Sequence, residues 1–99
     1  MLNIKTEREG GTVKFLLEGR LDTASAQKFE EEVKQAAAEA DALLLDFEKV
    51  EYISSAGLRV LLLALKLMRQ KGSLKIVHVN DLVQEIFDVT GFSNLLTIE

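Results

Sequence analysis

Two short segments with the pattern of β-strands precede a long helical pattern in the N-terminal half of the chain. Apolar and polar residues alternate at 2–7, and residues 13–19 form a second apolar-rich segment, so both predict strands. Gly10-Gly11 between them is typical of a hairpin turn. A loop is expected at 19–23, ending in good helix-capping residues. From residue 24 to 40, apolar residues recur at spacings of three and four, which predicts a helix. Its expected buried stripe is Ala26, Phe29, Val33, Ala36, Ala37 and Ala40.

The second half of the chain repeats the alternation of strand and helix. Residues 42–47 are a continuous apolar run, typical of a central strand that is covered on both faces. Strands that are separated by helices pair in parallel through right-handed crossovers. The expected elements are a strand at 42–47, a loop at 48–51, a helix from about Ser55 to Lys71 ended by Gly72, a strand at 74–79, a helix capped by Asn80-Asp81 and ended by Gly91, and a strand at 95–98.

The helix expected at 55–71 is apolar on more than one side. Such a helix is either buried on two sides or contacts a partner with part of its surface, and burial is favoured. The expected core stripe is Leu58, Leu61, Leu62, Leu65 and Met68, with Val60, Leu63, Ala64 and Leu67 beside it.

The order ββαβαβαβ predicts an α/β fold. Its sheet is mixed, with an N-terminal hairpin followed by mainly parallel strands, and helices cover it. The chain has 99 residues, enough for one domain over 1–99 with a single core.

Composition narrows the function classes. The chain has no cysteine, which excludes disulfides and thiolate chemistry and suits a reducing compartment. A net charge of −4 without a Lys/Arg cluster argues against nucleic-acid binding. The N-terminus lacks a signal-peptide pattern, and the apolar stretch at 60–68 is interrupted by Lys66 and too short to span a membrane. We therefore expect a cytoplasmic protein without membrane contact, and a monomer when alone.

Catalytic constellations are few. His78, the only histidine, lies between Val77 and Val79 and is interpreted as a structural strand residue, with a base or ligand role as the minority alternative. A Ser-His-Asp device would need His78 to meet Ser54 or Ser55 and also Asp22 or Asp46. The G-x-S-x-G pattern of a nucleophile elbow is missing. One histidine without cysteine offers no metal-ligand spacing, and no cofactor is expected.

The segment Ser54-Ser55-Ala56-Gly57 is the most informative part of the chain. It separates a short apolar segment from a long apolar helix, which places a hydroxyl at a helix N-terminus. One serine there serves as an N-cap, but a glycine in the first turn weakens a helix by about 1 kcal/mol relative to alanine. Because helix N-termini also attract anions, capping and a functional role remain equally open. For Asp22, a helix-capping role is favoured over a functional one. Asp22 and Asp46 could both lie beside this turn.

Four spaced blocks of the sequence resemble a known family. They are Leu17–Asp22, Ala42–Phe47, Val50–Leu58 and Ile86–Phe92. In this order they are similar to the bacterial anti-sigma factor antagonists, the single-domain form of the STAS fold. In that family the turn reads Asp-Ser-Ser/Thr-Gly-Leu, and the serine after the aspartate is phosphorylated. Matching Gly57-Leu58 to this motif sets Ser55 at the acceptor position; Ser54 replaces the usual aspartate and Ala56 the following hydroxyl residue.

The resemblance implies a partner switch. The unmodified domain would bind an anti-sigma factor that is also a serine kinase, which frees the sigma factor, and phosphorylation at Ser55 (alternatively Ser54) would prevent binding. A serine phosphatase would reset the switch, and the domain itself would need no catalytic residue. The partner-binding residues implied are Asp22, Thr23, Ser54, Ser55, Ala56, Gly57 and Arg59.

Two alternatives remain. The first is a STAS-like accessory or scaffold protein in a signalling or transport assembly, without a phosphoswitch. The second and weaker one is a small serine hydrolase that uses Ser54 or Ser55.

Overall fold

The two N-terminal strands form the predicted hairpin. In the computed structural model, which describes residues 2–99, β1 (Leu2–Glu9) pairs antiparallel with β2 (Thr12–Leu21). Gly10 has a φ of +60°, a backbone conformation that suits glycine in a two-residue turn.

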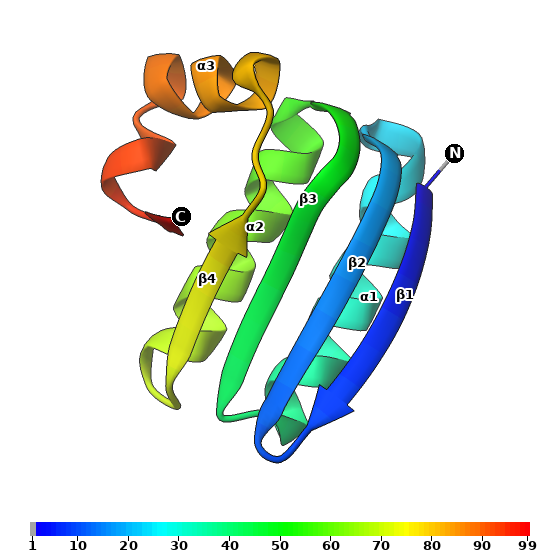
Figure 1. The fold of residues 1–99 in the computed structure, drawn as a ribbon, viewed down its shortest axis with the longest axis vertical. Coiled ribbons are helices and arrows are strands. Elements are labelled where there is room, and N and C mark those ends of the chain that lie inside the picture. Colours follow the sequence, from blue (N-terminus) through cyan, green and yellow to red (C-terminus); the bar gives the residue numbers. More distant parts are fainter. Residues whose placement is uncertain (1) are drawn as a thin grey trace.

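The remaining elements extend this hairpin into one five-stranded sheet (Figure 1). Its strands follow in the order β1-β2-β3-β4-β5, and all pairs after the hairpin are parallel. The predicted order ββαβαβαβ and the mixed sheet are therefore confirmed. The elements are α1 (Thr23–Glu39), β3 (Ala42–Ile53), α2 (Ser55–Arg69), β4 (Ser73–Val77), α3 (Asp81–Thr90), a 3-10 turn (Phe92–Asn94) and β5 (Thr97–Ile98).

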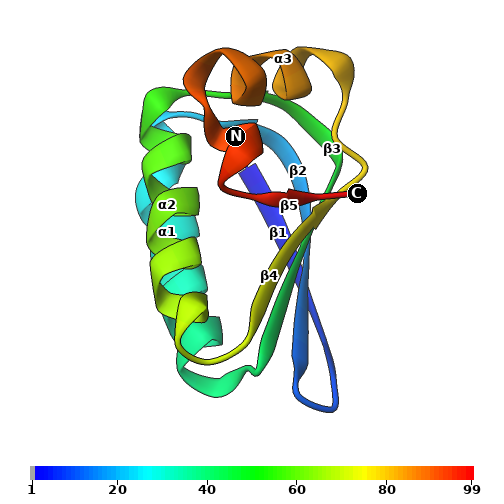
Figure 2. The same cartoon turned by 90° about the vertical axis from the view of Figure 1, so that its left-hand side faces the viewer.

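Helices α1 and α2 cover the same face of the sheet (Figure 2). Because β2, β3 and β4 are consecutive neighbours and crossovers share one hand, both helices return on one side. On β3, Leu43, Leu45 and Phe47 point to that side and are fully buried, whereas Leu44 between them is partly exposed. The prediction that this strand is covered on both faces was wrong. We call the other side, which carries Leu16, Leu44 and Asp46, the open face.

Both central strands are longer than predicted. The expected loops at 19–23 and 48–51 instead continue β2 and β3, which pair through Gly19 with Val50 and Leu21 with Ile53. Register shifts between Leu16 and Glu18 and between Gly19 and Arg20 accommodate the irregular pairing. The charged residues that suggested a loop at 48–51 lie exposed on the strand.

The end of α2 differs from the prediction. The helix stops at Arg69 with Gln70 as its C-cap, and Gly72 does not have the left-handed conformation expected of a C′ residue. Glycine is needed there for another reason: a Cβ on Gly72 would lie 1.6 Å from the carbonyl oxygen of Asp41. In contrast, Gly91 ends α3 with a φ of +83°, as predicted.

The buried side of α2 is only partly the predicted one. The helix lies beside α1 on the same face of the sheet and packs against α1, β3 and β4 (Figure 2), which agrees with the favoured interpretation of burial. Leu62 and Leu65, assigned to the core stripe, remain partly exposed, as do Leu63 and Leu67. The buried positions are Gly57, Leu58, Val60, Leu61, Ala64 and Met68. Within residues 2–99, no helix has the length and apolar character needed to cross a membrane.

Candidate functional site

Helices α1 and α2 begin side by side, at the ends of the adjacent strands β2 and β3. The last pairs of β2 and β3 are Arg20 with Tyr52 and Leu21 with Ile53, and the next residue on each strand caps a helix. Asp22 is the N-cap of α1 and Ser54 is the N-cap of α2. The amide of Ser54 donates to the carbonyl oxygen of Leu21 at 2.8 Å, which joins the two strand ends directly. The structure therefore brings Asp22 and the Ser54-Ser55 turn together.

The two serines at the start of α2 have different environments. The Ser54 hydroxyl accepts a long hydrogen bond of 3.4 Å from the amide of Gly57, and its side chain is half-buried. Ser55 is the first residue of the helix and is exposed. Arg59, also exposed, follows four residues later, one turn along the helix. Ser54 thus caps the helix, whereas the hydroxyl of Ser55 is accessible to a partner.

Gly57 allows the turn to lie close to β2. It is buried, and a Cβ at this position would be 2.8 Å from Cγ1 of Ile53 and 2.9 Å from the carbonyl oxygen of Leu21. Ala56 beside it is partly buried. A larger side chain in this turn would therefore displace the start of α2 from the sheet, which explains a glycine that helix propensity disfavours.

The start of α1 is built with a charged cap. The carboxylate of Asp22 accepts from the amide of Ser25 at 3.1 Å, and the Ser25 hydroxyl accepts from the amide of Asp22 at 3.1 Å, which forms a reciprocal capping box. The hydrogen bond from the Ser25 amide lowers the pKa of Asp22 below its ordinary value. Arg20 lies 3.7 Å from this carboxylate and stacks over the ring of Tyr52 at 4.7 Å. Thr23, the first residue of α1, is exposed.

The charge at the helix N-termini distinguishes α2 from the others. Helix α1 has Asp22 at its cap and α3 has Asp81 in its first turn. Helix α2 has neither an acidic cap nor an acidic residue in its first turn. The N-terminal end of a helix carries a partial positive charge, and among these helices of residues 2–99 only α2 has no carboxylate in its own cap or first turn. This arrangement favours an added anion at Ser55.

Asp46 and His78 lie elsewhere on the sheet. Asp46 is inside β3 and not at its end, so the suggestion that it flanks the serine turn was wrong. His78 follows the end of β4 with a φ of +60°, so it is not the strand residue predicted. Its Nδ1 lies 3.1 Å from Oδ1 of Asp46. The histidine is thus paired with a carboxylate eight residues before Ser54 along β3, which does not support a Ser-His-Asp device.

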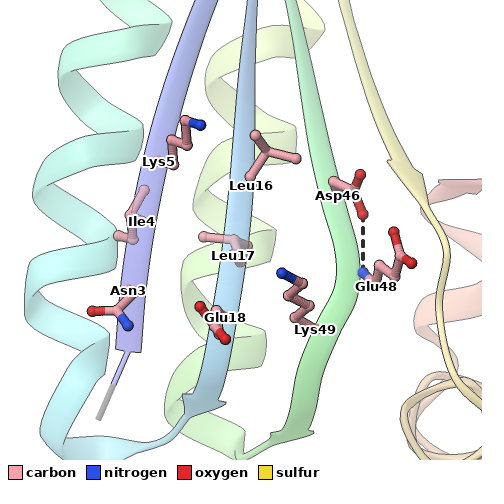
Figure 3. Close-up of a pocket in the computed structure, with 9 residues that line it drawn as sticks. All are labelled: Asn3, Ile4, Lys5, Leu16, Leu17, Glu18, Asp46, Glu48 and Lys49. Atoms are coloured by element: carbon pink, nitrogen blue, oxygen red, sulfur yellow. Dashed lines mark hydrogen bonds between the residues drawn. The ribbon is translucent and has the colours of Figure 1, made fainter.

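A shallow pocket lies beside Asp46 on the open face (Figure 3). It has a volume of about 270 Å³ and is lined by residues of β1, β2 and β3, Asp46, Glu48 and Lys49 among them. Asp46, Glu48 and His78 also bring three potential metal ligands together. Sequence spacing could not show this cluster, because His78 is 32 residues from Asp46 and only the β3–β4 pairing joins them.

Comparison with known proteins decides the family. The sequence matches the STAS domain family over residues 3–99. The chain belongs to this family. The proposed anti-sigma factor antagonist BtrV of Bordetella bronchiseptica is 32% identical over 98% of this chain and 85% of its own. The anti-sigma-B factor antagonist of Listeria monocytogenes is 32% identical over 94% of this chain and 83% of its own. The STAS domain therefore falls among the anti-sigma factor antagonists, as the sequence blocks suggested.

Solved structures show the same fold. An anti-sigma factor antagonist from Mycobacterium paratuberculosis matches this STAS domain with a TM-score of 0.91 at 19% identity, over 99% of this chain and 85% of that one. SpoIIAA matches in its unphosphorylated form with a TM-score of 0.84 at 17% identity, over 98% and 88%. Bacillus SpoIIAA in its phosphorylated form matches with 0.76 at 16% identity, over 98% and 91%.

Proposed function

We propose that this STAS domain binds an anti-sigma factor in its unphosphorylated form, which releases a sigma factor, and that phosphorylation of Ser55 switches this binding off. The names of its relatives support the first part of the proposal. The observation that carries the second part is the contrast between the serines: Ser54 is half-buried and caps α2, while Ser55 is exposed. A kinase needs an accessible hydroxyl, and of the two serines Ser55 offers it.

A phosphate on Ser55 is compatible with the folded domain. It adds about −1.5 to −2 charges at a helix start that has no acidic residue of its own. The N–H groups of the first turn and the helix dipole favour such an anion, and Arg59 one turn later can pair with it. Solved structures of SpoIIAA in unphosphorylated and phosphorylated forms support the idea that this fold tolerates a phosphate. We therefore expect the phosphate to change partner binding and to leave the fold intact.

The proposed partner surface surrounds the two helix starts. Ser55, Thr23 and Arg59 are its exposed side chains, whereas Gly57 contributes only the close approach of the backbone. A partner that desolvates this surface, or that is negatively charged there, would be repelled by phosphoserine. The residues assigned to the surface are Asp22, Thr23, Ser54, Ser55, Ala56, Gly57 and Arg59.

In this proposal the partner proteins catalyse the chemical steps of the switch. The anti-sigma factor acts as the serine kinase, a separate serine phosphatase resets the switch, and the STAS domain supplies the acceptor hydroxyl without a catalytic residue. These partners act on transcription, so the proposal assigns the protein to the cytoplasm.

Phosphorylation mapping tests the proposal. The purified protein is incubated with ATP and each candidate anti-sigma kinase from its own genome, and the phosphate is located by mass spectrometry. We expect Ser55→Ala to abolish phosphorylation and Ser54→Ala to reduce it at most. Thr23→Ala is the matched control, because Thr23 is also an exposed hydroxyl residue at the start of a helix. Loss of the phosphate in Ser54→Ala but not in Ser55→Ala would contradict the assignment, and stable binding to other assemblies without phosphorylation would favour the scaffold alternative.

A further inference from the structure

Three side chains with metal-binding atoms converge beside the open face, away from the Ser55 turn. Asp46 and Glu48 belong to β3, and His78 follows β4. Nδ1 of His78 lies 3.1 Å from Oδ1 of Asp46 and 4.0 Å from Oε1 of Glu48. One ligand atom from each of the three lies within 4.8 Å of the other two. Ligand atoms in a tetrahedral site with bonds of about 2.1 Å are about 3.4 Å apart, so the separations are close to those a metal ion requires.

The Asp46 side chain is mostly buried, and the carboxylate oxygen that accepts no hydrogen bond is accessible to solvent. Its side chain is 7% exposed. Oδ1 accepts from the amide of Glu48 at 2.9 Å and faces His78, while Oδ2 accepts no hydrogen bond from residues 2–99. Burial alone raises the pKa of Asp46, but the Glu48 amide and His78 outweigh it and leave the pKa below its ordinary value.

Among the described residues, lysines lie near this carboxylate without pairing with it, and Lys5 and Lys49 line the same pocket. Within the described part of the chain, Asp46 and Glu48 lie within 4 Å of no lysine or arginine nitrogen, and their ion-pair contacts are both with His78. Lys14 on β2 also contributes a favourable field at Asp46. A mostly buried carboxylate is stabilised by a compensating positive charge, which a bound divalent cation would supply.

His78 and Glu48 are free to complete a coordination sphere. Their side chains are 60% and 71% exposed, so a small movement of Glu48 shortens its 4.0 Å separation from the imidazole. Nδ1 must carry a proton to donate to Asp46, and a metal ion could take the place of that proton. Asp46 and Glu48 also line the pocket of about 270 Å³ (Figure 3), which leaves room for water molecules at the remaining positions.

We propose that Asp46, Glu48 and His78 bind a first-row divalent cation, with Zn²⁺ as the best fit. One imidazole nitrogen and two carboxylate oxygens suit Zn²⁺ better than Mg²⁺ or Ca²⁺, which prefer oxygen ligands alone. Water completes the site, so its coordination is open on the solvent side. None of these residues belongs to the Ser55 turn, and the site is independent of the proposed phosphoswitch.

The single histidine makes the test direct. His78 is the only histidine and the chain has no cysteine, so in tag-free protein with ¹⁵N-labelled histidine one imidazole reports any metal bound through nitrogen. We expect Zn²⁺ to shift the Nδ1 resonance of His78 and to fix the remaining proton on Nε2. The same concentration of Mg²⁺ should leave both resonances unchanged.

Matched variants separate the site from general surface binding. Calorimetric titration with Zn²⁺ should show at least about a tenfold loss of affinity in His78→Asn and in Glu48→Gln, a change at the scale seen when metal sites lose ligand support. Asparagine is chosen at position 78 because it tolerates a positive φ. Glu51→Gln, an exposed carboxylate of the same strand, should bind as the wild type does. Asp46→Asn should also lose binding, with circular dichroism to check that it folds.

Three results would overturn the proposal. These are an Nδ1 resonance that does not respond to millimolar Zn²⁺, unchanged affinity in both His78→Asn and Glu48→Gln, or an equal loss in Glu51→Gln. Each can occur whether or not Ser55 is phosphorylated, so failure here is distinguishable from failure of the phosphoswitch.

Discussion

The N-termini of α1 and α2 are neighbours with parallel construction but different chemistry. Each follows a central strand, each has a hydroxyl residue in its exposed first position, and each has alanine next. They differ at the cap, which is Asp22 in α1 and Ser54 in α2, and at the third helical residue, which is Ser25 and Gly57. The compared segments are Asp22-Thr23-Ala24-Ser25 and Ser54-Ser55-Ala56-Gly57.

The difference lies in how far each helix start is satisfied within the domain. At α1 the backbone donors and the helix dipole are satisfied within the domain, by the Asp22 carboxylate and the reciprocal bonds with Ser25. At α2 a single hydroxyl makes one long bond of 3.4 Å to the amide of Gly57. The start of α2 can therefore still accept an anion, and a negative charge added there is not opposed by a carboxylate in the cap or first turn of α2.

The largest expected effect comes from adding a charge at each first position. Ser55→Asp should unfold at nearly the wild-type temperature, because the dipole favours the new carboxylate. It should nevertheless lose about tenfold or more in affinity for the anti-sigma factor, since an unfavourable charge in an interface costs several kcal/mol. Thermal unfolding and calorimetric binding measure the two effects.

Thr23→Asp is the matched variant. Its new carboxylate stands beside Asp22 and gains less from the dipole, so it should be less stable than Ser55→Asp. If Ser55→Asp binds the anti-sigma factor normally, or if it is unfolded, the comparison between the two helix starts does not explain the switch.

The next effect concerns the third position of α2. Gly57→Ala places a Cβ against the Leu21 carbonyl oxygen and the Ile53 side chain, and overpacking of this kind costs about 1–3 kcal/mol. Urea unfolding should show this loss despite the better helix propensity of alanine. Gly91→Ala serves as a comparison in open space, where the cost comes from the positive φ alone. Unchanged stability in Gly57→Ala would mean that α2 can move away from the sheet without cost.

A smaller effect should follow from giving α2 the acidic cap of α1. Ser54→Asp should stabilise the unphosphorylated domain by about 0.3–1 kcal/mol, because a carboxylate at the N-cap accepts a backbone hydrogen bond and complements the dipole. Chemical unfolding at low salt measures the gain, and added salt should reduce it. A loss of stability in Ser54→Asp would show that the start of α2 has no unsatisfied positive field.

The smallest expected effect is a change in pH dependence at α1. Because the pKa of Asp22 is lowered in the folded state, its contribution to stability is fully present above its unfolded pKa and disappears as the pH falls through the lowered value. Asp22→Asn keeps a capping oxygen but cannot titrate. Its free energy of unfolding should therefore fall less than that of the wild type between neutral and acidic pH. Parallel curves for the two proteins would contradict the assigned role of the carboxylate.

Much of the fold and of the Ser55 site could be predicted because the signals are local. The hairpin follows from the alternation at 2–7 and from Gly10-Gly11, and the helix start at Ser54-Ser55 follows from capping preferences. Sequence reasoning was weaker where charged residues, which suggest a loop, belong to a strand. Glu48 and Lys49 are charged, yet they belong to β3, because an exposed strand position accepts charge as readily as a loop does.

The sequence by itself determined the order of the elements and the caps that begin the helices, since each depends on neighbours within a few residues. Tertiary structure alone decided that both crossover helices cover one face and that Asp22 and Ser54 lie side by side. It also decided that His78 meets Asp46. These features depend on the spatial order of the strands in the sheet and on the register between strands far apart in the chain, and local periodicity carries no information about either.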